Sequence, residues 1–266
     1  MKTALDRIVD YKRDEVAALK RERTMASLLA DARAQTPTRG FARSMEAVVA
    51  NGQNALICEL KRKSPSAGEI LPGADPVEIA REYEAGGAAC LSILTDFPSF
   101  GGSLEDLVAI RDAVSLPALR KEFMIDEIQV AEARAHGADA ILVILSAVDD
   151  TVALALIQTA NDFGMDVIVE VHDESELERA NLLPCPLIGI NNRDLKRMVT
   201  DLSTTERLAS ALAPGKTLIS ESGIAEPAHI SRLRKSGARR FLIGENLMKS
   251  KNRQLKCSNL SRALDD

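Results

Sequence analysis

From about residue 55 onward, the chain alternates short runs of apolar, largely β-branched residues with longer amphipathic stretches. Short apolar runs are typical of buried strands, and amphipathic stretches are typical of helices that cover a sheet. We count eight such runs, at residues 55–61, 89–95, 117–123, 138–146, 166–171, 186–191, 216–221 and 239–244. Their separation of roughly 20 to 34 residues suits one strand plus one helix, so the pattern predicts a (β/α)₈ TIM barrel.

Glycines mark the ends of several predicted helices, next to Ala85, His136, Phe163 and Ser236. A glycine at this position adopts the left-handed conformation at little steric cost, which ends a helix cleanly. A doubly wound open sheet has a similar alternation of elements. However, no G-x-G-x-x-G follows the first predicted strand, and we therefore favour the barrel.

Residues 1–48 stand outside the repeat. Apolar residues recur there at near-helical spacing within a highly charged run: Leu5, Ile8, Val9, Val16 and Leu19. This spacing predicts an N-terminal helical extension, and we expect it to pack across one mouth of the barrel. The barrel itself is expected to take residues 49–266, and no linker is long enough to separate a second domain.

Composition narrows the choice of partners. The 266 residues are 45% hydrophobic and 27% charged, which is ordinary for a globular chain. Eight aromatic residues (six Phe, two Tyr) and a net charge of −5 argue against nucleic-acid binding. No apolar run approaches the roughly 20 residues that span a bilayer, and the start lacks the apolar core of a signal peptide. We expect a cytosolic protein with no membrane partner.

The four cysteines, Cys58, Cys90, Cys185 and Cys257, form no C-x-x-C pair. Their wide spacing indicates neither a disulfide framework nor a zinc site. We expect buried free thiols.

Charged and polar residues gather at the predicted carboxyl ends of the strands, where a barrel assembles its active site. They are Glu59, Lys61, Lys121, Glu170, Asn191 and Glu221. Each alone suits a solvated or salt-bridged strand end. Two lysines and three glutamates at one apolar mouth are costly to bury unless the charges pair and take part in chemistry, so we interpret them together as catalytic.

Two turns near the chain end are suited to anions. They lie at residues 220–224 and 242–246, after the seventh and eighth predicted strands, where barrels commonly bind phosphate through backbone N–H groups. Lys63 and Ser64 in the first loop have donors for the same oxygens. The pattern predicts a small phosphorylated substrate, although Gly223 and Gly244 also suit simple tight turns.

Several blocks of this sequence, in order, resemble the signature of the indole-3-glycerol phosphate synthase family. The blocks are residues 59–66, 94–96 with 100–103, 120–123, 189–195, 220–224 and 241–244. Together they make the resemblance specific, where any single block would be weak. It implies conversion of 1-(2-carboxyphenylamino)-1-deoxyribulose 5-phosphate to indole-3-glycerol phosphate, with loss of CO₂ and water, in tryptophan biosynthesis.

The resemblance also implies roles for individual residues. Lys121 is the leading general acid, Lys61 protonates or orients the carbonyl and meets the substrate carboxylate, and Glu170 acts in the later dehydration, although the division of protons among the three stays open. Glu59, Asn191 and Glu221 position these groups and bind hydroxyls. The substrate anions and ring are assigned to Lys63, Ser64, Arg193, Ser222, Gly223, Gly244 and, for the ring, Phe100.

The scheme needs no metal or organic cofactor, because an iminium formed within the substrate drives out CO₂. His172 and Asp173 follow Glu170, but His136 and His229 fall on predicted helices, so no ligand set forms. We expect a monomer, and contacts with other tryptophan-pathway enzymes stay open.

Two features depart from the family pattern. Glu245 follows Gly244 where a small residue is common, and a carboxylate aimed at the phosphate would weaken binding. The stretch after Met248 offers a thin apolar face, made of Leu255, Leu260, Ala263 and Leu264, so we expect a short or frayed final helix.

Two other functions remain as alternatives. A Schiff-base phosphosugar aldolase needs little more than a strand-end lysine beside a phosphate site. A noncatalytic barrel that only binds a phosphate ligand is the second.

Overall fold

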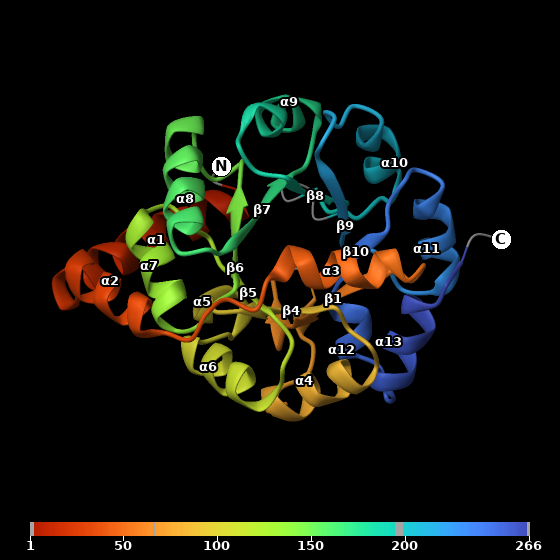
Figure 1. Cartoon of the computed structure of the whole chain (residues 1–266), viewed down its shortest axis with the longest axis horizontal. Helices are drawn as coiled ribbons and strands as arrows, with labels where there is room; N and C mark the ends of the chain where they lie inside the picture. Colours follow the sequence, from red (N-terminus) through yellow and green to blue (C-terminus); the bar gives the residue numbers. More distant parts are fainter. Residues whose placement is uncertain (1–2, 66, 195–198, 265–266) are drawn as a thin grey trace.

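The computed structural model describes residues 3–65, 67–194 and 199–264. Eight parallel strands form a closed barrel, because β1 pairs with β4 on one side and β10 on the other (Figure 1). The predicted TIM barrel is confirmed. Its strands are β1 (Ala55–Leu60), β4 (Cys90–Leu94), β5 (Ala118–Lys121), β6 (Ala140–Ile144), β7 (Asp166–Val171), β8 (Leu187–Asn191), β9 (Thr217–Glu221) and β10 (Arg240–Ile243).

Helices follow the strands and form the outer layer (Figure 1). They are α4 (Pro76–Ala85), α6 (Leu104–Ala113), α7 (Glu127–Ala135), α8 (Asp150–Asp162), α9 (Glu174–Leu182), α10 (Ser203–Ala209) and α11 (Pro227–Arg234). The loop after β1 holds the hairpin of β2 (Lys63–Ser64) and β3 (Gly68–Glu69), and the loop after β4 holds α5 (Phe97–Phe100). Gly87, Gly137, Gly164 and Gly237 end helices at positive φ, as the sequence indicates. No described helix is long and apolar enough to cross a membrane.

Alternation along each strand separates two apolar layers. On β7, Val167, Val169 and Val171 pack under the helices, whereas Ile168 belongs to the interior of the barrel. Glu170 shares the inward parity of Ile168 one step closer to the carboxyl end. The same pleat that buries the apolar interior therefore turns the strand-end charges into the mouth.

The N-terminal extension contacts both ends of the barrel, not one as expected. It consists of α1 (Ala4–Glu22), α2 (Met25–Ala34) and α3 (Phe41–Ala50). Phe41 and Met45 of α3 are fully buried against Ala55 and Cys90, which begin their strands, so α3 closes the amino end (Figure 1). Ile8 of α1 instead lines the cavity at the carboxyl end.

The chain end folds as α12 (Glu245–Met248) and α13 (Arg253–Ser261), which corrects the expectation of a frayed helix. Cys257 is fully buried and Leu260 is nearly so, whereas Leu255 points outward and is 55% exposed. The buried Asn54 amide donates to the carbonyls of Leu260 and Ser261, which fastens the last turn to the start of β1. The sequence pattern failed here because it omitted cysteine from the apolar face and because the anchor comes from a distant residue.

All four cysteines are buried free thiols, as predicted. Sγ of Cys58 on β1 lies 3.6 Å from Sγ of Cys257 on α13. Burial holds the pKa of the Cys58 thiol well above its ordinary value, so this pair acts as apolar packing between helix and strand.

Candidate active site

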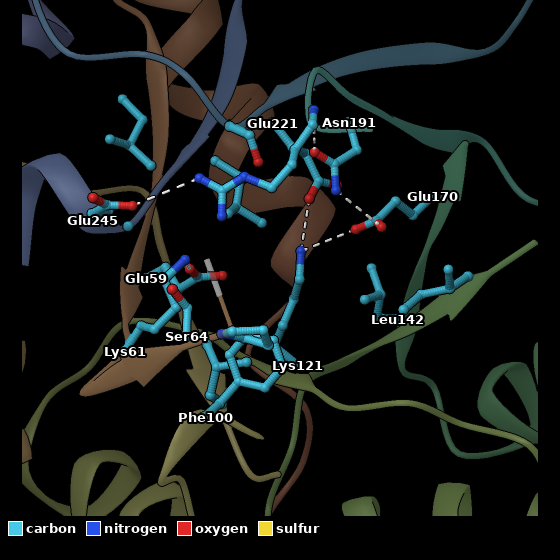
Figure 2. A pocket seen from close by; sticks show the side chains of 18 of the residues that line it. Glu59, Lys61, Ser64, Phe100, Lys121, Leu142, Glu170, Asn191, Glu221 and Glu245 are labelled. Carbon is cyan, nitrogen blue, oxygen red and sulfur yellow. Dashed lines mark hydrogen bonds and ion pairs between the residues drawn. The ribbon is translucent and has the colours of Figure 1, made fainter. Parts of the chain in front are cut away.

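The carboxyl end of the barrel holds a cavity of about 330 Å³, walled by strand ends and by α1 (Figure 2). It is lined by thirteen of the fourteen residues assigned from the sequence: Glu59, Lys61, Ser64, Phe100, Lys121, Glu170, Asn191, Arg193, Glu221, Ser222, Gly223, Gly244 and Glu245. Ser66 and Leu195, which close two of the signature blocks, lie outside the described residues.

Lys121, at the end of β5, reaches across the mouth between two carboxylates (Figure 2). Its Nζ donates to Oε2 of Glu221 at 2.7 Å and to Oε2 of Glu170 at 3.2 Å. Burial alone would lower the pKa of the ammonium, but the charges of Glu221, Glu170 and Glu59 outweigh it and hold that pKa above its ordinary value. Lys121 is therefore a cation with a proton to give.

Glu170, at the end of β7, receives donors on both carboxylate oxygens. Besides Lys121 on Oε2, the side-chain amide of Asn191 donates to Oε1 at 3.1 Å. Burial would raise the pKa of this carboxyl, but Lys121, His172 and Asn191 together hold it below its usual range. Glu170 stays ionised at neutral pH.

Glu221 has the opposite balance. Burial, and the nearby charge of Glu170, raise the pKa of this carboxyl to about 7 despite the pull of Lys121. Two carboxylates that share one lysine thus differ in pKa, an arrangement typical of acid and base partners.

Gly189 on β8 makes the room that Glu221 occupies. A Cβ at this position would lie 2.1 Å from Oε1 of Glu221 and 3.0 Å from Cγ2 of Ile168. The sequence analysis did not single out this residue. A glycine inside a strand is the signal that a side chain or ligand approaches the backbone closely.

We expect Gly189→Ala to lower kcat by roughly 10- to 100-fold, because a small displacement of Glu221 moves the nearest partner of Lys121. Overpacking should also cost about 1–3 kcal/mol of stability, measured by urea unfolding. Adding Glu221→Asp, which shortens the acid by one methylene, should return part of the activity. Wild-type kcat in Gly189→Ala would contradict this role.

Glu59 and Lys61 form a second ion pair on the wall of the cavity, at 2.6 Å between Oε1 and Nζ. Burial would raise the pKa of Glu59, but Lys61 and Lys121 lower it below the ordinary value. Gly244 faces this pair, since a Cβ there would lie 2.4 Å from Oε1 of Glu59. Gly244 is assigned to an anion-binding turn, and a side chain at this position would also displace Glu59.

The turn after β9 carries the groups suited to an anion. Ser222 has a φ of 67° and Gly223 a φ of 79°, and both residues line the cavity. Asn192, which is 2% exposed, holds the turn by donating to the carbonyl of Ser222 at 3.1 Å. Sequence analysis missed Asn192, although it is the second Asn of the block at residues 189–195.

Glu245 begins α12 at the edge of this turn, and its charge is met by two cations. Its Oε1 accepts from Nζ of Lys249 at 2.6 Å, and its Oε2 lies 3.6 Å from a terminal nitrogen of Arg193. Lys249 chiefly lowers the pKa of this carboxyl. These two cations offset the negative charge of Glu245, so its expected repulsion of a bound phosphate is reduced.

An apolar wall completes the cavity. The rings of Phe100 and Phe123 lie 6.0 Å apart at 34°, and Leu5 and Ile8 of α1 line the same space. Neither Phe123 nor the α1 residues were assigned to the site from the sequence. The helical spacing of Leu5 and Ile8 was visible, but not the surface that they cover.

Lys63 is the one assigned residue that the structure does not bring to the lining of this cavity. Its Nζ lies 5.6 Å from the ring centroid of Phe97, which is also outside the cavity lining. Ser64, by contrast, lines the cavity and is 4% exposed. A role for Lys63 in anion binding stays a prediction.

His172 contacts the site from behind Glu170. It was considered above only as a metal ligand, and over residues 3–65, 67–194 and 199–264 no group of three or more His, Cys, Asp or Glu residues forms a metal-binding cluster. The sequence feature that indicates a role for His172 in the site is its position two residues after Glu170, at the end of a predicted strand.

A closed barrel with an ionised lysine between buried carboxylates, beside the turn of Ser222 and Gly223 that lines the same cavity, defines a TIM-barrel enzyme of small anionic substrates. Residues 5–260 match the family described as indole-3-glycerol phosphate synthase. The chain belongs to this family, which confirms the resemblance seen in the sequence blocks.

Relatives of that name are closely similar over nearly the whole chain. The protein from Hyphomonas neptunium is 68% identical over 249 residues, covering 94% of each chain. Those from Rhodospirillum rubrum (49%, covering 94% of this chain and 95% of the relative) and Azospirillum brasilense (47%, covering 95% and 96%) are also similar.

Solved structures support the fold alone. A 3-hexulose-6-phosphate synthase aligns with a TM-score of 0.63 at 16% identity, covering 79% of this chain and 99% of that one. The enzyme of that name from Salmonella typhimurium aligns with a TM-score of 0.64 at 12% identity, covering 78% and 96%.

Proposed function

We propose that this protein closes the indole ring of indole-3-glycerol phosphate from 1-(2-carboxyphenylamino)-1-deoxyribulose 5-phosphate. The observation that carries the proposal is Lys121, a cation held between Glu170 and Glu221 in the same cavity as an apolar wall and an anion turn. The substrate has the matching parts: an aromatic ring, a ketone, and anionic groups at both ends.

Ring closure requires an acid at the ketone oxygen. The ring carbon that bears the carboxylate attacks the ketone carbon, a C–C bond forms, and Lys121 gives its proton to the oxygen. Electrons drawn from the ring leave an iminium at the substrate nitrogen. Lys61, which follows β1, meets the substrate carboxylate, with Glu59 holding it in place.

Two losses then complete the indole. The carboxylate leaves as CO₂, and its bonding pair neutralises the iminium. The new hydroxyl then departs as water while a proton leaves the neighbouring carbon. Glu170 is the ionised carboxylate placed to take part in this dehydration, and Glu221 and Asn191 hold the reacting groups.

The rest of the substrate is bound by the remaining assigned residues. Phe100 packs against the anthranilate ring, and Ser222, Gly223, Gly244 and Arg193, with Ser64 across the mouth, bind the phosphate. We place Glu245 at the rim of that phosphate site, held by Lys249.

The direct test is the appearance of indole fluorescence when the purified protein alone receives the carboxyphenylamino substrate. Turnover without an added metal or cofactor is the expected result. Tight substrate binding with no turnover would instead support the noncatalytic barrel.

A Schiff-base aldolase is disfavoured by the charge of Lys121. Covalent attack on a ketone needs a neutral amine, whereas neighbouring carboxylates keep the pKa of this ammonium above its ordinary value. Borohydride treatment in the presence of a phosphorylated ketose should leave the mass of the protein unchanged. A stoichiometric adduct at Lys61 or Lys121 would favour the aldolase.

A further inference from the structure

His172 holds Glu170 from outside the cavity. Its Nε2 lies 3.2 Å from Oε1 of Glu170, and its Nδ1 lies 3.0 Å from Oε2 of Glu176. The imidazole is 11% exposed, and it is not among the residues that line the described cavity. It therefore acts on Glu170 without a place to touch the substrate.

The surroundings of His172 set its charge. Nδ1 makes a hydrogen bond with Oε2 of Glu176, and Nε2 lies 3.2 Å from Oε1 of Glu170 without the geometry of a hydrogen bond. The two adjacent carboxylates favour the charged imidazolium electrostatically. Burial would lower the pKa of His172, but Glu170 and Glu176 raise it to about 10.

The turn from β7 to α9 keeps the ring in place. Oε2 of Glu176 also accepts from the backbone N–H of His172 at 2.8 Å. Asp173 caps α9 by accepting from the backbone N–H of Glu176 at 2.9 Å. Glu176 thus ties the ring to a capped helix and keeps Nε2 beside Glu170.

This arrangement matters at the moment of proton transfer. Glu170 and Glu221 share Lys121 as a cation. When Lys121 releases its proton, the positive charge of His172 still lies beside Glu170. The neighbouring Glu221, whose pKa is about 7, is the carboxylate ready to take up a proton.

We propose that His172 is a positioning residue, which keeps Glu170 ionised and correctly oriented while Lys121 transfers its proton. This role rests on the proposed function. The other titratable groups that face the pair are Lys121 from β5, Glu221 from β9, Glu59 from β1 and Glu176 from α9.

Kinetics of His172→Gln test the role. We expect kcat to fall roughly 10-fold while KM changes less than about 2-fold, because the interaction acts in the reaction and not in binding. Glu174→Gln is the matched control, since Glu174 is an exposed acid on the same turn and pairs with Arg207. It should leave kcat unchanged.

The pH profile separates positioning from general damage. Wild-type kcat should decline as pH rises through about 10, where His172 loses its proton, and before Lys121 does. His172→Gln should lack this step. The folded-state pKa of His172 is raised, so its contribution to stability is complete below pH 6.5 and lost as pH rises through about 10. A fall in kcat by the same factor at every pH would overturn the proposal.

Nitrogen NMR reads the charge directly, because the chain has only three histidines. The signal missing from His172→Gln is that of His172, and it should show both nitrogens protonated from pH 7 to 9. Glu176→Gln, a second variant that keeps the ring, should lower the pKa of His172. A neutral ring at pH 7.5 in the wild type would overturn the proposal.

The outcomes for the two proposals are distinct. An unmodified protein that forms no indole from the substrate contradicts the proposed function and this role with it. An active wild type with an equally active His172→Gln overturns the role of His172 alone.

Discussion

Replacing Lys121 by alanine should lower kcat by about 10²- to 10⁴-fold, the loss expected when a general acid is removed. The ammonium lies in the cavity, and its carboxylate partners at 2.7 and 3.2 Å keep it charged. The measurement is the rate of indole fluorescence at saturating substrate.

The fold needs its own control, because Lys121→Ala leaves Glu170 and Glu221 buried without their shared cation. Breaking a buried ion pair in this way can cost about 3–5 kcal/mol. The double variant Lys121→Ala with Glu221→Gln removes one of the two stranded charges, so it should recover stability but not turnover. Lys20→Ala, on exposed α1 surface, should match the wild type. Near-normal turnover in Lys121→Ala would remove Lys121 from the mechanism.

The second large effect concerns Lys12, which fastens α1 over the mouth of the barrel. Its Nζ lies 2.8 Å from Asp96 and 2.9 Å from Glu122, and all three side chains are at most 3% exposed. Burial would lower the pKa of this ammonium, but Glu122, Asp96 and Glu15 raise it above its ordinary value. Lys12 is therefore a buried cation at the junction of three chain segments.

Lys12→Ala should lower the free energy of unfolding by about 3–5 kcal/mol, because it strands two buried carboxylates. Urea denaturation measures the loss. Arg13→Ala is the matched control on the same helix: Arg13 is 67% exposed and pairs with Asp10, so its loss should cost less than about 1 kcal/mol. Equal stability of the two variants would contradict the structural role of Lys12.

The contact of Lys12 with Asp96 and Glu122 also links α1 to the reaction. Asp96 begins the α5 segment that carries Phe100, and Glu122 lies between Lys121 and Phe123. If α1 loosens, the wall made by Leu5 and Ile8 moves as well. We therefore expect Lys12→Ala to raise KM for the substrate in addition to lowering stability.

The sequence predicted the barrel because its main signals are local. Strand and helix periods, and glycines after helices, depend on neighbouring residues only. Their positions at the ends of predicted strands also placed Glu59, Lys121, Glu170 and Glu221 in one mouth, since a parallel barrel collects all its carboxyl ends there. The ordered signature blocks then pointed to the family before any distance was known.

Errors arose where residues far apart in the chain meet. The final helix looked too polar to pack, but Asn54 anchors it and Cys257 fills its apolar face. Lys63 follows the anion-binding pattern in sequence; its Nζ lies 5.6 Å from the ring centroid of Phe97, outside the cavity lining, and its role in anion binding stays a prediction. Neither contact has a signature in a short window of sequence.

By itself, the sequence determined the fold class, the family and the set of charges at the barrel mouth, because these follow from local periods and residue order. Only the tertiary structure decided which charges pair. The sharing of Lys121 between Glu170 and Glu221, the space that Gly189 leaves, and the imidazolium of His172 behind Glu170 depend on ångström distances between strands. Burial and Coulomb energies change steeply over such distances, so residue types alone do not set them.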